Sequence, residues 1–325
     1  MKILNYGAGA VGLGLDSCLL KASERVDLIA REKTVASLKD HGLIRSGLFE
    51  DFKAAPQSFG AYASLDDLPL GPYDLILVTT KSFDSEAAAK DLSSHPSLFS
   101  PRTKIVLFQN GWGNAEIFCR YFPEGNIYSA RVITGFCRPE PHEVNITVHA
   151  DDIRIGSLFN APPENMEKLC ETISRGGLPC RTVASIARDI WAKMLYNCAL
   201  NPLGAILDVP YGALAENLAS REIMETILQE TFLVMKAAGY ETHWKTPKAY
   251  MKIFYEQLVP STARHHSSTL QDLKAGKRTE IEALNGMVCR LGQANNLSVA
   301  ANRMMTQMIK FIEVRNMAGR ACMET

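Results

Sequence analysis

The first half of the chain alternates short apolar runs with helical periodicities. Uninterrupted apolar runs are typical of strands that are covered on both faces of a parallel sheet. Such runs predict strands at 2–6, 26–30, 74–80 and 104–109. Apolar residues at helical spacing predict crossover helices at 13–21 and 85–92. Two further β-rich stretches, 127–134 and 144–156, are expected as antiparallel additions to the sheet. The pattern therefore predicts an α/β domain with a doubly wound parallel sheet.

From Ala184 onward the strand-like runs stop and helical periodicity takes over. It predicts helices at 189–201, 220–238, 248–258, 267–275, 279–294 and 300–316. Asn285-Gly286 would ordinarily indicate a turn, but its apolar flanks keep helical spacing, so we expect a helix interior there. The chain is thus expected to form an α/β domain over 1–183 and a mostly helical domain over 184–325.

Charge and composition favour an enzyme of the cytoplasm. The 325 residues include 35 basic and 35 acidic side chains, so no nucleic-acid partner is indicated. No window approaches the roughly 20 apolar residues of a membrane span, and a strand that begins at Lys2 leaves no room for a cleaved signal. The eight cysteines are scattered without paired spacing, which favours reduced thiols over a disulfide framework. The adjacent pair His265-His266 does not have the spacing of a metal site, and no metal is expected.

The first predicted strand runs directly into a glycine-rich turn. The segment consists of Gly7, Ala8, Gly9, Ala10, Val11 and Gly12, followed by a predicted helix. A G-x-G-x-x-G pattern between a strand and a helix suits the pyrophosphate of a dinucleotide, which binds the unpaired amides at the helix N-terminus. The simpler interpretation is a tight turn without a ligand. The context makes this turn the candidate cofactor site, and domain 1–183 a Rossmann-type domain.

The charge after the second strand indicates which dinucleotide binds. An NAD site usually carries a carboxylate at this strand end, whereas an arginine accommodates the 2′-phosphate of NADP. Here the strand ends in Ala30-Arg31-Glu32-Lys33, and Asp27 lies inside the strand. Arg31 therefore favours NADP, although it could also be a solvated turn residue beside Glu32.

Two loops after later strands carry polar side chains at the edge where ligands bind in open α/β sheets. Lys81 could contact a cofactor phosphate or ribose, and Asn110 offers a donor and an acceptor beside Gly111. A solvated lysine and an ordinary Asn-Gly turn are equally compatible with the sequence.

The predicted helix 189–201 carries a polar stripe. Lys193, Asn197 and Asn201 recur at a spacing of four and so share one face of a helix that is otherwise apolar. A buried lysine is rare unless it is paired or used in chemistry. The stripe could grip a carboxylate and a carbonyl, or it could simply face water.

From Lys2 to about Leu297 the chain resembles the ketopantoate reductase (2-dehydropantoate 2-reductase) family. The resemblance rests on the glycine turn, Arg31, Lys81, Asn110-Gly111, the Lys193 helix with Asn201-Pro202-Leu203, Ser268-Thr269-Leu270-Gln271-Asp272 and Thr279-Glu280-Ile281. It implies NADPH-dependent reduction of a 2-oxo acid to a 2-hydroxy acid, with 2-dehydropantoate giving pantoate for pantothenate biosynthesis. It further implies that Lys193 is the catalytic acid and that Glu280 contacts the cofactor and couples to Lys193. Asn110, Asn197, Asn201 and Ser268 would hold the substrate or position the nicotinamide.

One motif departs from the family. Its reductases commonly have Pro-Asn-Gly where this chain has Pro210-Tyr211-Gly212, so no substrate role is carried onto Tyr211. Residues 130–144 align poorly with the family, and no role is assigned to them.

The alternative function is that of a related NAD(P)-dependent hydroxyacid dehydrogenase that acts on another substrate. The apolar C-terminal helix from Ala300 could serve a homodimer interface or the domain core.

Overall fold

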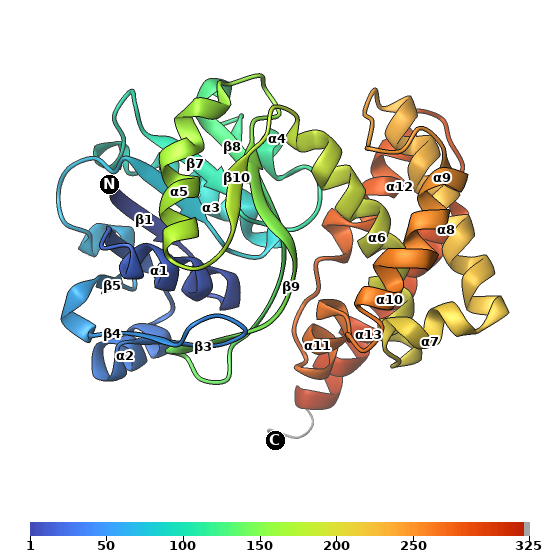
Figure 1. The fold of residues 1–325 in the computed structure, drawn as a ribbon, viewed down its shortest axis with the longest axis horizontal. Coiled ribbons are helices and arrows are strands. Elements are labelled where there is room, and N and C mark those ends of the chain that lie inside the picture. Colours follow the sequence, from blue (N-terminus) through green and yellow to red (C-terminus); the bar gives the residue numbers. More distant parts are fainter. Residues whose placement is uncertain (322–325) are drawn as a thin grey trace. The chain divides into compact units, whose positions relative to one another are not determined.

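The computed structural model describes residues 1–321, with side chains described through Met317, and the chain separates into two compact units. Unit 1 comprises 1–109 and 114–186, and unit 2 comprises 110–113 together with the residues from 187 onward. The short segment 110–113 thus leaves the strand before it and clusters with the second half of the chain. Figure 1 shows the sheet-containing unit 1 in blue to green and the helical unit 2 in yellow-green to red.

Unit 1 is built on a mixed sheet of ten strands. The strands are β1 (Lys2–Tyr6), β2 (Arg25–Ile29), β3 (Leu43–Gly47), β4 (Phe52–Ala54), β5 (Gly60–Tyr62), β6 (Leu75–Val78), β7 (Lys104–Leu107), β8 (Ile127–Cys137), β9 (Glu143–Gly156) and β10 (Cys180–Thr182). Their order is β4-β3-β9-β8-β7-β6-β1-β2-β5, with β10 beside β9. The run from β5 to β8 is parallel, whereas β9 is antiparallel to β8. The predicted parallel core is confirmed. Of the two stretches expected as antiparallel additions, only 144–156 (β9) is antiparallel to its neighbour β8; the expectation for 127–134 is wrong, because β8 pairs parallel with β7 and extends the parallel core.

Five α-helices belong to unit 1. They are α1 (Ala10–Lys21), α2 (Glu32–His41), α3 (Ser85–Ser93), α4 (Asn114–Phe118) and α5 (Glu167–Arg175). Helix α1 is buried on all sides from Gly12 to Leu19, because its neighbours include β2, β3, β4, β8, β9 and α5. A helix that is apolar around its whole circumference is expected to lie inside a core. The glycine turn that precedes α1 is therefore held by a rigid element.

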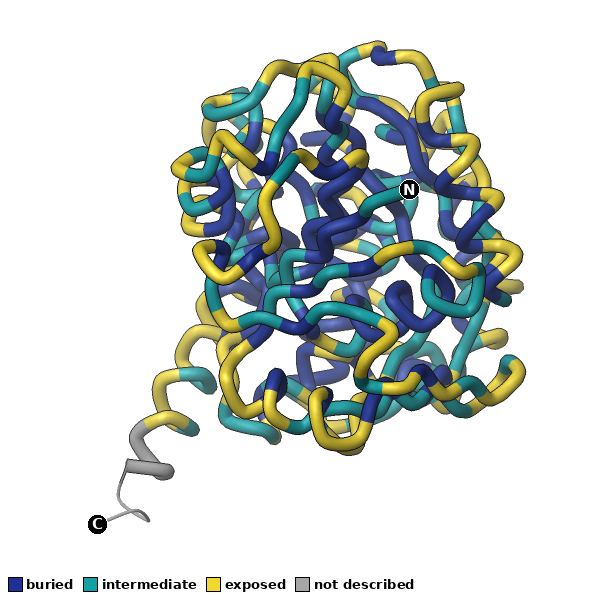
Figure 2. Tube along the Cα trace, turned by 90° about the vertical axis from the view of Figure 1, so that its left-hand side faces the viewer, coloured by how far each residue is buried: buried dark blue, intermediate teal, exposed yellow. Residues whose placement is uncertain are grey.

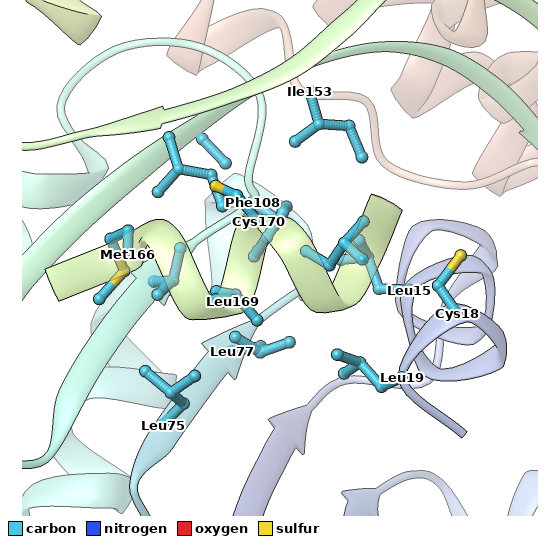
Figure 3. Packing of buried hydrophobic residues seen from close by; sticks show 14 of the residues in the cluster. Leu15, Cys18, Leu19, Leu75, Leu77, Phe108, Ile153, Met166, Leu169 and Cys170 are labelled. Carbon is cyan, nitrogen blue, oxygen red and sulfur yellow. The ribbon is translucent and has the colours of Figure 1, made fainter. Parts of the chain in front are cut away.

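The core of unit 1 packs the sheet against α1 and α5. Leu169 and Cys170 of α5 share one buried cluster with Leu77 of β6 and Leu19 of α1 (Figure 3). Buried positions follow the strands and helix interiors, whereas the connecting turns are largely exposed (Figure 2). The apolar runs read from the sequence are thus the positions removed from water.

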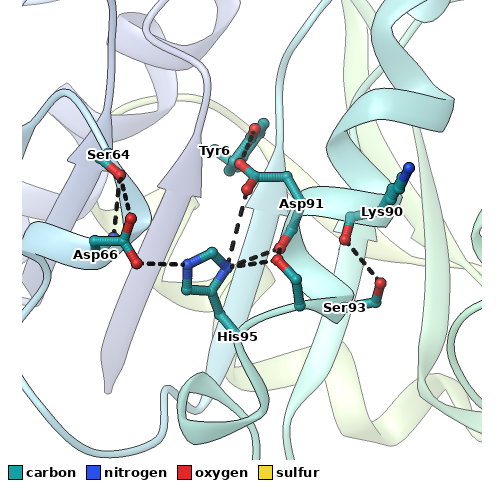
Figure 4. Close-up of polar contacts among 8 residues, drawn as sticks. Tyr6, Ser64, Asp66, Lys90, Asp91, Ser93 and His95 are labelled. Carbon is teal, nitrogen blue, oxygen red and sulfur yellow. Dashed lines mark hydrogen bonds and ion pairs between the residues drawn. The ribbon is translucent and has the colours of Figure 1, made fainter.

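A polar cluster ties the end of α3 to the sheet (Figure 4). Tyr6 at the end of β1 donates a 2.6 Å hydrogen bond to Asp91 Oδ2. His95 contacts two aspartates: its Nδ1 lies 2.8 Å from the backbone oxygen of Asp91, and its Nε2 lies 3.1 Å from Asp66 Oδ1. The Asp91 carbonyl and the two carboxylates raise the pKa of His95. These contacts attach α3, the loop after it and the 3-10 turn at Leu65–Asp67 to the end of β1.

Unit 2 is helical. Its helices are α6 (Ile186–Leu207), α7 (Tyr211–Glu216), α8 (Leu218–Ala237), α9 (Pro247–Ile253), α10 (Val259–Ser261), α11 (Ser268–Lys274), α12 (Asn285–Ala294) and α13 (Ala300–Ala321). A π-helical turn at Phe254–Leu258 links α9 to α10. Within the described residues no helix is long and apolar enough to cross a membrane.

The predicted helix 279–294 is wrong in its first part. A 3-10 turn (Ile281–Ala283) precedes α12, which begins at Asn285, so Asn285-Gly286 opens the helix and does not lie in its interior. Asn285 donates 3.0 Å hydrogen bonds to the Cys198 carbonyl and to Asn302 Oδ1, which anchors the helix start in the core. A Cβ on Gly286 would lie 2.6 Å from Glu282 Oε2, so a larger residue at the helix start would displace the Glu282 side chain.

Candidate active site

The glycine turn between β1 and α1 uses two of its glycines for internal packing. Gly7 has φ +122°, a value that non-glycine residues rarely adopt. A Cβ on Gly12 would lie 2.2 Å from the Gly7 carbonyl oxygen and 2.7 Å from Thr79 Oγ1. The packing of the turn therefore explains Gly7 and Gly12 without any ligand.

Gly9 has no such internal reason to be glycine. Its φ is −75°, and a Cβ there would meet only the Thr79 carbonyl oxygen at 3.9 Å. Gly9 is also the N-cap of α1, and the first turn of α1 contains no acidic residue. Unpaired amides and the positive end of the helix dipole are thus presented beside an open backbone, as a pyrophosphate requires. The geometry of the turn fits a dinucleotide.

The other predicted cofactor residues of unit 1 lie at the same sheet edge. Arg31 is the exposed N-cap of α2, directly after β2, and Lys81 follows β6 as the cap of a short 3-10 turn. Because β6, β1 and β2 are parallel neighbours, their carboxyl ends share one edge. Asp27 is engaged elsewhere, since Tyr73 donates a 2.8 Å hydrogen bond to its Oδ2.

The segment after β7 is locked into unit 2. Gly111 has φ +86°, and a Cβ on it would lie 2.4 Å from the Ala283 carbonyl oxygen. The Trp112 amide donates a 3.0 Å hydrogen bond to that same carbonyl. The Trp112 ring packs 5.0 Å from Trp191 and 4.5 Å from Tyr240, measured between centroids. No role was predicted for Trp112, although a tryptophan between two glycines was a usable signal. It anchors the loop that carries Asn110.

Asn110 links the two charged residues predicted for catalysis. Lys193 on α6 donates a hydrogen bond from Nζ to Asn110 Oδ1. Asn110 Nδ2 in turn donates a 3.2 Å hydrogen bond to Glu280 Oε2. The amide is thus oriented by an ammonium on one side and a carboxylate on the other. The structure brings together three residues that lie 83 and 170 positions apart in the sequence.

The remaining predicted substrate residues follow α6. Asn197 and Asn201 are buried one and two turns beyond Lys193, on the same face of the helix. Ser268 is exposed at the start of α11. Its neighbour Ser267 is buried, caps α11 and donates a 3.1 Å hydrogen bond to the Asn201 carbonyl. The start of α11 is therefore attached to the polar stripe at Asn201.

Tyr211, the residue that departs from the family pattern, is also attached to this stripe. Its ring is 3 % exposed, and its hydroxyl donates a 2.6 Å hydrogen bond to Asn201 Oδ1. The ring packs edge-on against Tyr196 and lies 5.3 Å from His265. Burial raises the pKa of Tyr211, so it stays a neutral donor. Sequence reasoning missed this bond because the reach of a buried phenol cannot be read from a pattern.

Comparison with known proteins decides the family. The descriptions "Ketopantoate reductase PanE/ApbA" and "Ketopantoate reductase PanE/ApbA C terminal" match residues 3–160 and 185–313. The chain belongs to the ketopantoate reductase family. It is 34 % identical over 318 residues to the 2-dehydropantoate 2-reductase of Aquifex aeolicus, covering 98 % of each chain. The enzyme of the same name from Pyrococcus horikoshii is 29 % identical, with 95 % and 97 % covered. This makes the protein an oxidoreductase of that family.

Solved structures agree on the fold. A PanE/ApbA family ketopantoate reductase from Ralstonia eutropha superposes with a TM-score of 0.84 at 28 % identity, covering 97 % of this chain and 99 % of that one. A D-mandelate dehydrogenase, solved with NADH and anilino(oxo)acetate, has a TM-score of 0.85 at 24 % identity and the same coverage. At that identity the second likeness concerns the fold alone. The same fold thus occurs in proteins named ketopantoate reductase and D-mandelate dehydrogenase.

Proposed function

We propose that this protein reduces a 2-oxo acid to the corresponding 2-hydroxy acid with NADPH, and that its substrate is 2-dehydropantoate, which gives pantoate. The observation that carries the proposal is the Lys193–Asn110–Glu280 hydrogen-bonded cluster in unit 2. Membership of the ketopantoate reductase family and relatives named 2-dehydropantoate 2-reductase support the substrate. Arg31 after β2 supports a cofactor that carries a 2′-phosphate.

When bound, the reduced nicotinamide supplies the hydride for the C2 carbonyl carbon. Lys193 Nζ donates a proton to the carbonyl oxygen as negative charge develops there, and its positive charge stabilises that oxygen. Lys193 is then reprotonated from solvent, which balances the reaction at one hydride and one proton. A positioned acid of this kind accelerates a reaction by about 10²–10⁴-fold.

Asn110 and Glu280 position the acid. The Asn110 carbonyl accepts from Lys193, and the Glu280 carboxylate holds the Asn110 amide in the orientation that permits this. Asn197 and Asn201, buried along the same face of α6, supply amide groups for the carboxylate and hydroxyl oxygens of the substrate. Ser268 at the start of α11 adds a hydroxyl next in sequence to Ser267, which bonds the Asn201 carbonyl.

A related NAD(P)-dependent hydroxyacid dehydrogenase with another substrate is the second candidate. Tyr211 favours it, because a buried phenol occupies the position of the family's asparagine and bonds Asn201 directly. The likeness in fold to a D-mandelate dehydrogenase supports this second candidate.

Purified protein assayed for NADPH oxidation with 2-dehydropantoate and a panel of aliphatic and aromatic 2-oxo acids separates the two candidates. Highest kcat/KM for 2-dehydropantoate supports the first. Turnover confined to another 2-oxo acid supports the second and identifies Tyr211 for mutation. Absence of turnover with the whole panel contradicts both.

A cytoplasmic location and a homodimer complete the proposal. The exposed face of α13 supports the homodimer, since Met304, Met308 and Phe311 recur at spacings of four and three and are 57 %, 39 % and 68 % exposed. Apolar residues gathered on one helix face commonly mark an interface. Figure 2 shows the described end of this helix largely in the colours of exposed and intermediate positions. Light scattering at several concentrations measures the mass, and a monomer throughout contradicts the homodimer.

A further inference from the structure

The turn between β8 and β9, for which no role was predicted, lies beside the glycine turn of unit 1. Phe136 at the end of β8 packs on α1, where a Cβ on Gly14 would lie 2.4 Å from its Cε1. His142, just before β9, packs on α2 through a 2.8 Å contact between Nδ1 and Ser37 Oγ and a 4.5 Å ring contact with His41. The turn is therefore anchored at both ends on the two helices that follow the glycine turn and Arg31.

Arg138 lies in this anchored turn and bonds the glycine turn itself. Its Nη1 donates a 2.7 Å hydrogen bond to the carbonyl oxygen of Ala8. Burial and the positive charge of Arg31 lower the pKa of Arg138, so the two guanidinium groups are close enough to repel each other. Ala8, Arg31 and Arg138 come from three separate segments of unit 1, which are the glycine turn, the end of β2 and the β8–β9 turn.

An anion bound by both Arg31 and Arg138 would offset the repulsion between their positive charges. Among the described residues, neither Arg31 nor Arg138 forms an ion pair with a carboxylate. A phosphate monoester carries about −1.5 to −2 charges at neutral pH and several acceptor oxygens. The planar fork of a guanidinium matches such oxygens with two parallel donors. Since one Nη of Arg138 is held by Ala8, its other N–H groups can serve the ligand.

We propose that Arg138 is a specificity-determining residue, which together with Arg31 binds the 2′-phosphate on the adenosine ribose of the cofactor. This inference rests on the proposed use of NADPH and adds a second guanidinium to the site. A phosphate could also come from the pyrophosphate that NADH and NADPH share, which would give Arg138 affinity without selectivity. The two sources make opposite predictions for ligands that lack the 2′-phosphate.

Titration calorimetry of the Arg138→Gln variant distinguishes them without any turnover. Four ligands are used: NADP⁺, NAD⁺, adenosine 2′,5′-bisphosphate and adenosine 5′-monophosphate. Loss of a charge-assisted bond predicts that the dissociation constants of NADP⁺ and the bisphosphate rise about 10- to 100-fold. Those of NAD⁺ and the monophosphate are expected to stay within about two-fold. Arg102→Gln, an exposed arginine just before β7, is the matched control and leaves all four unchanged.

Three results would overturn the proposal. Equal weakening of NADP⁺ and NAD⁺ assigns Arg138 to the pyrophosphate, and unchanged binding of all four ligands removes it from the site. A wild-type protein that binds NAD⁺ as tightly as NADP⁺ contradicts the proposed cofactor itself, and with it the role of Arg138. Thermal unfolding of Arg138→Gln near the wild-type temperature shows that lost affinity is not lost fold.

Discussion

The glycine turn offers a test in which two similar substitutions have opposite consequences. Gly9→Ala adds a methyl group where the nearest atom outside its chain neighbours is 3.9 Å away, at a φ of −75° that alanine adopts readily. Gly12→Ala adds the same methyl group 2.2 Å from the Gly7 carbonyl oxygen. The fold therefore accepts the first change and resists the second.

The magnitudes follow from these contacts. Replacing glycine by alanine where the backbone permits it stabilises a protein by about 0.4–1 kcal/mol, so Gly9→Ala should unfold slightly later than wild type. In Gly12→Ala, overpacking costs about 1–3 kcal/mol of stability. The helix preference of alanine over glycine offsets only about 1 kcal/mol of this, so we expect the variant to be less stable than wild type. The Gly9 methyl group would nevertheless stand where the pyrophosphate approaches the backbone. We expect it to weaken dinucleotide binding by about ten-fold or more, equivalent to about 1.4 kcal/mol.

Denaturant unfolding and calorimetric titration with NADP⁺ measure both effects on the same samples. The reasoning predicts that Gly9→Ala keeps its stability and loses affinity. A Gly9→Ala variant that binds NADP⁺ like wild type would show that the phosphates lie elsewhere. If Gly12→Ala were as stable as wild type, the packing argument for that glycine would be refuted.

Two further changes probe the substrate stripe and the buried network under the glycine turn. Tyr211→Phe removes the 2.6 Å bond to Asn201 and leaves a buried acceptor without its donor, so we expect a loss of about 1–3 kcal/mol of stability. We also expect a higher KM for the 2-oxo acid at unchanged NADPH affinity. Equal KM values for variant and wild type would show that Asn201 does not contact the substrate. Burial raises the pKa of Asp16 to about 8 against a hydrogen bond from Asn5 that lowers it. The folded state then holds this proton more tightly than the unfolded chain, so the contribution of Asp16 to stability is greatest below about pH 4 and falls by about 1.4 kcal/mol per pH unit up to about pH 8. Asp16→Asn should remove that slope in urea unfolding at pH 5 and pH 8, and parallel curves for variant and wild type would contradict the assignment.

The parts of the fold that were predictable from the sequence are those with local signals. The apolar runs of β1, β6 and β7 and the glycine turn each show their pattern within a few residues. The strands β3, β4 and β5 were not predicted, because these short segments (LIRSG, FKA and GAY) contain polar residues or glycine and form no uninterrupted apolar run. Strand β3 gains its partner far along the chain, where Ile44 pairs with Glu143. Such short strands are defined by tertiary pairing, which no local periodicity reveals.

The candidate site divides in the same way. The polar stripe of Lys193, Asn197 and Asn201 is a property of one helix and could be read from its spacing. The bond from Lys193 to Asn110 depends on the loop that Trp112 inserts into unit 2, and the bond from Arg138 to Ala8 joins positions 130 residues apart. Only the family resemblance connected Glu280 to Lys193 in advance. Contacts between distant segments are fixed by packing, so the structure was needed to find them.

Steady-state kinetics of Lys193→Ala test whether Lys193 is the general acid. We expect kcat for reduction of the best 2-oxo acid to fall by about 10²–10⁴-fold. The dissociation constant of NADPH should stay near the wild-type value. Lys252→Ala, an exposed lysine on α9 in the same unit, controls for the loss of one positive charge and should turn over normally. Turnover of Lys193→Ala within a few-fold of wild type would contradict the account.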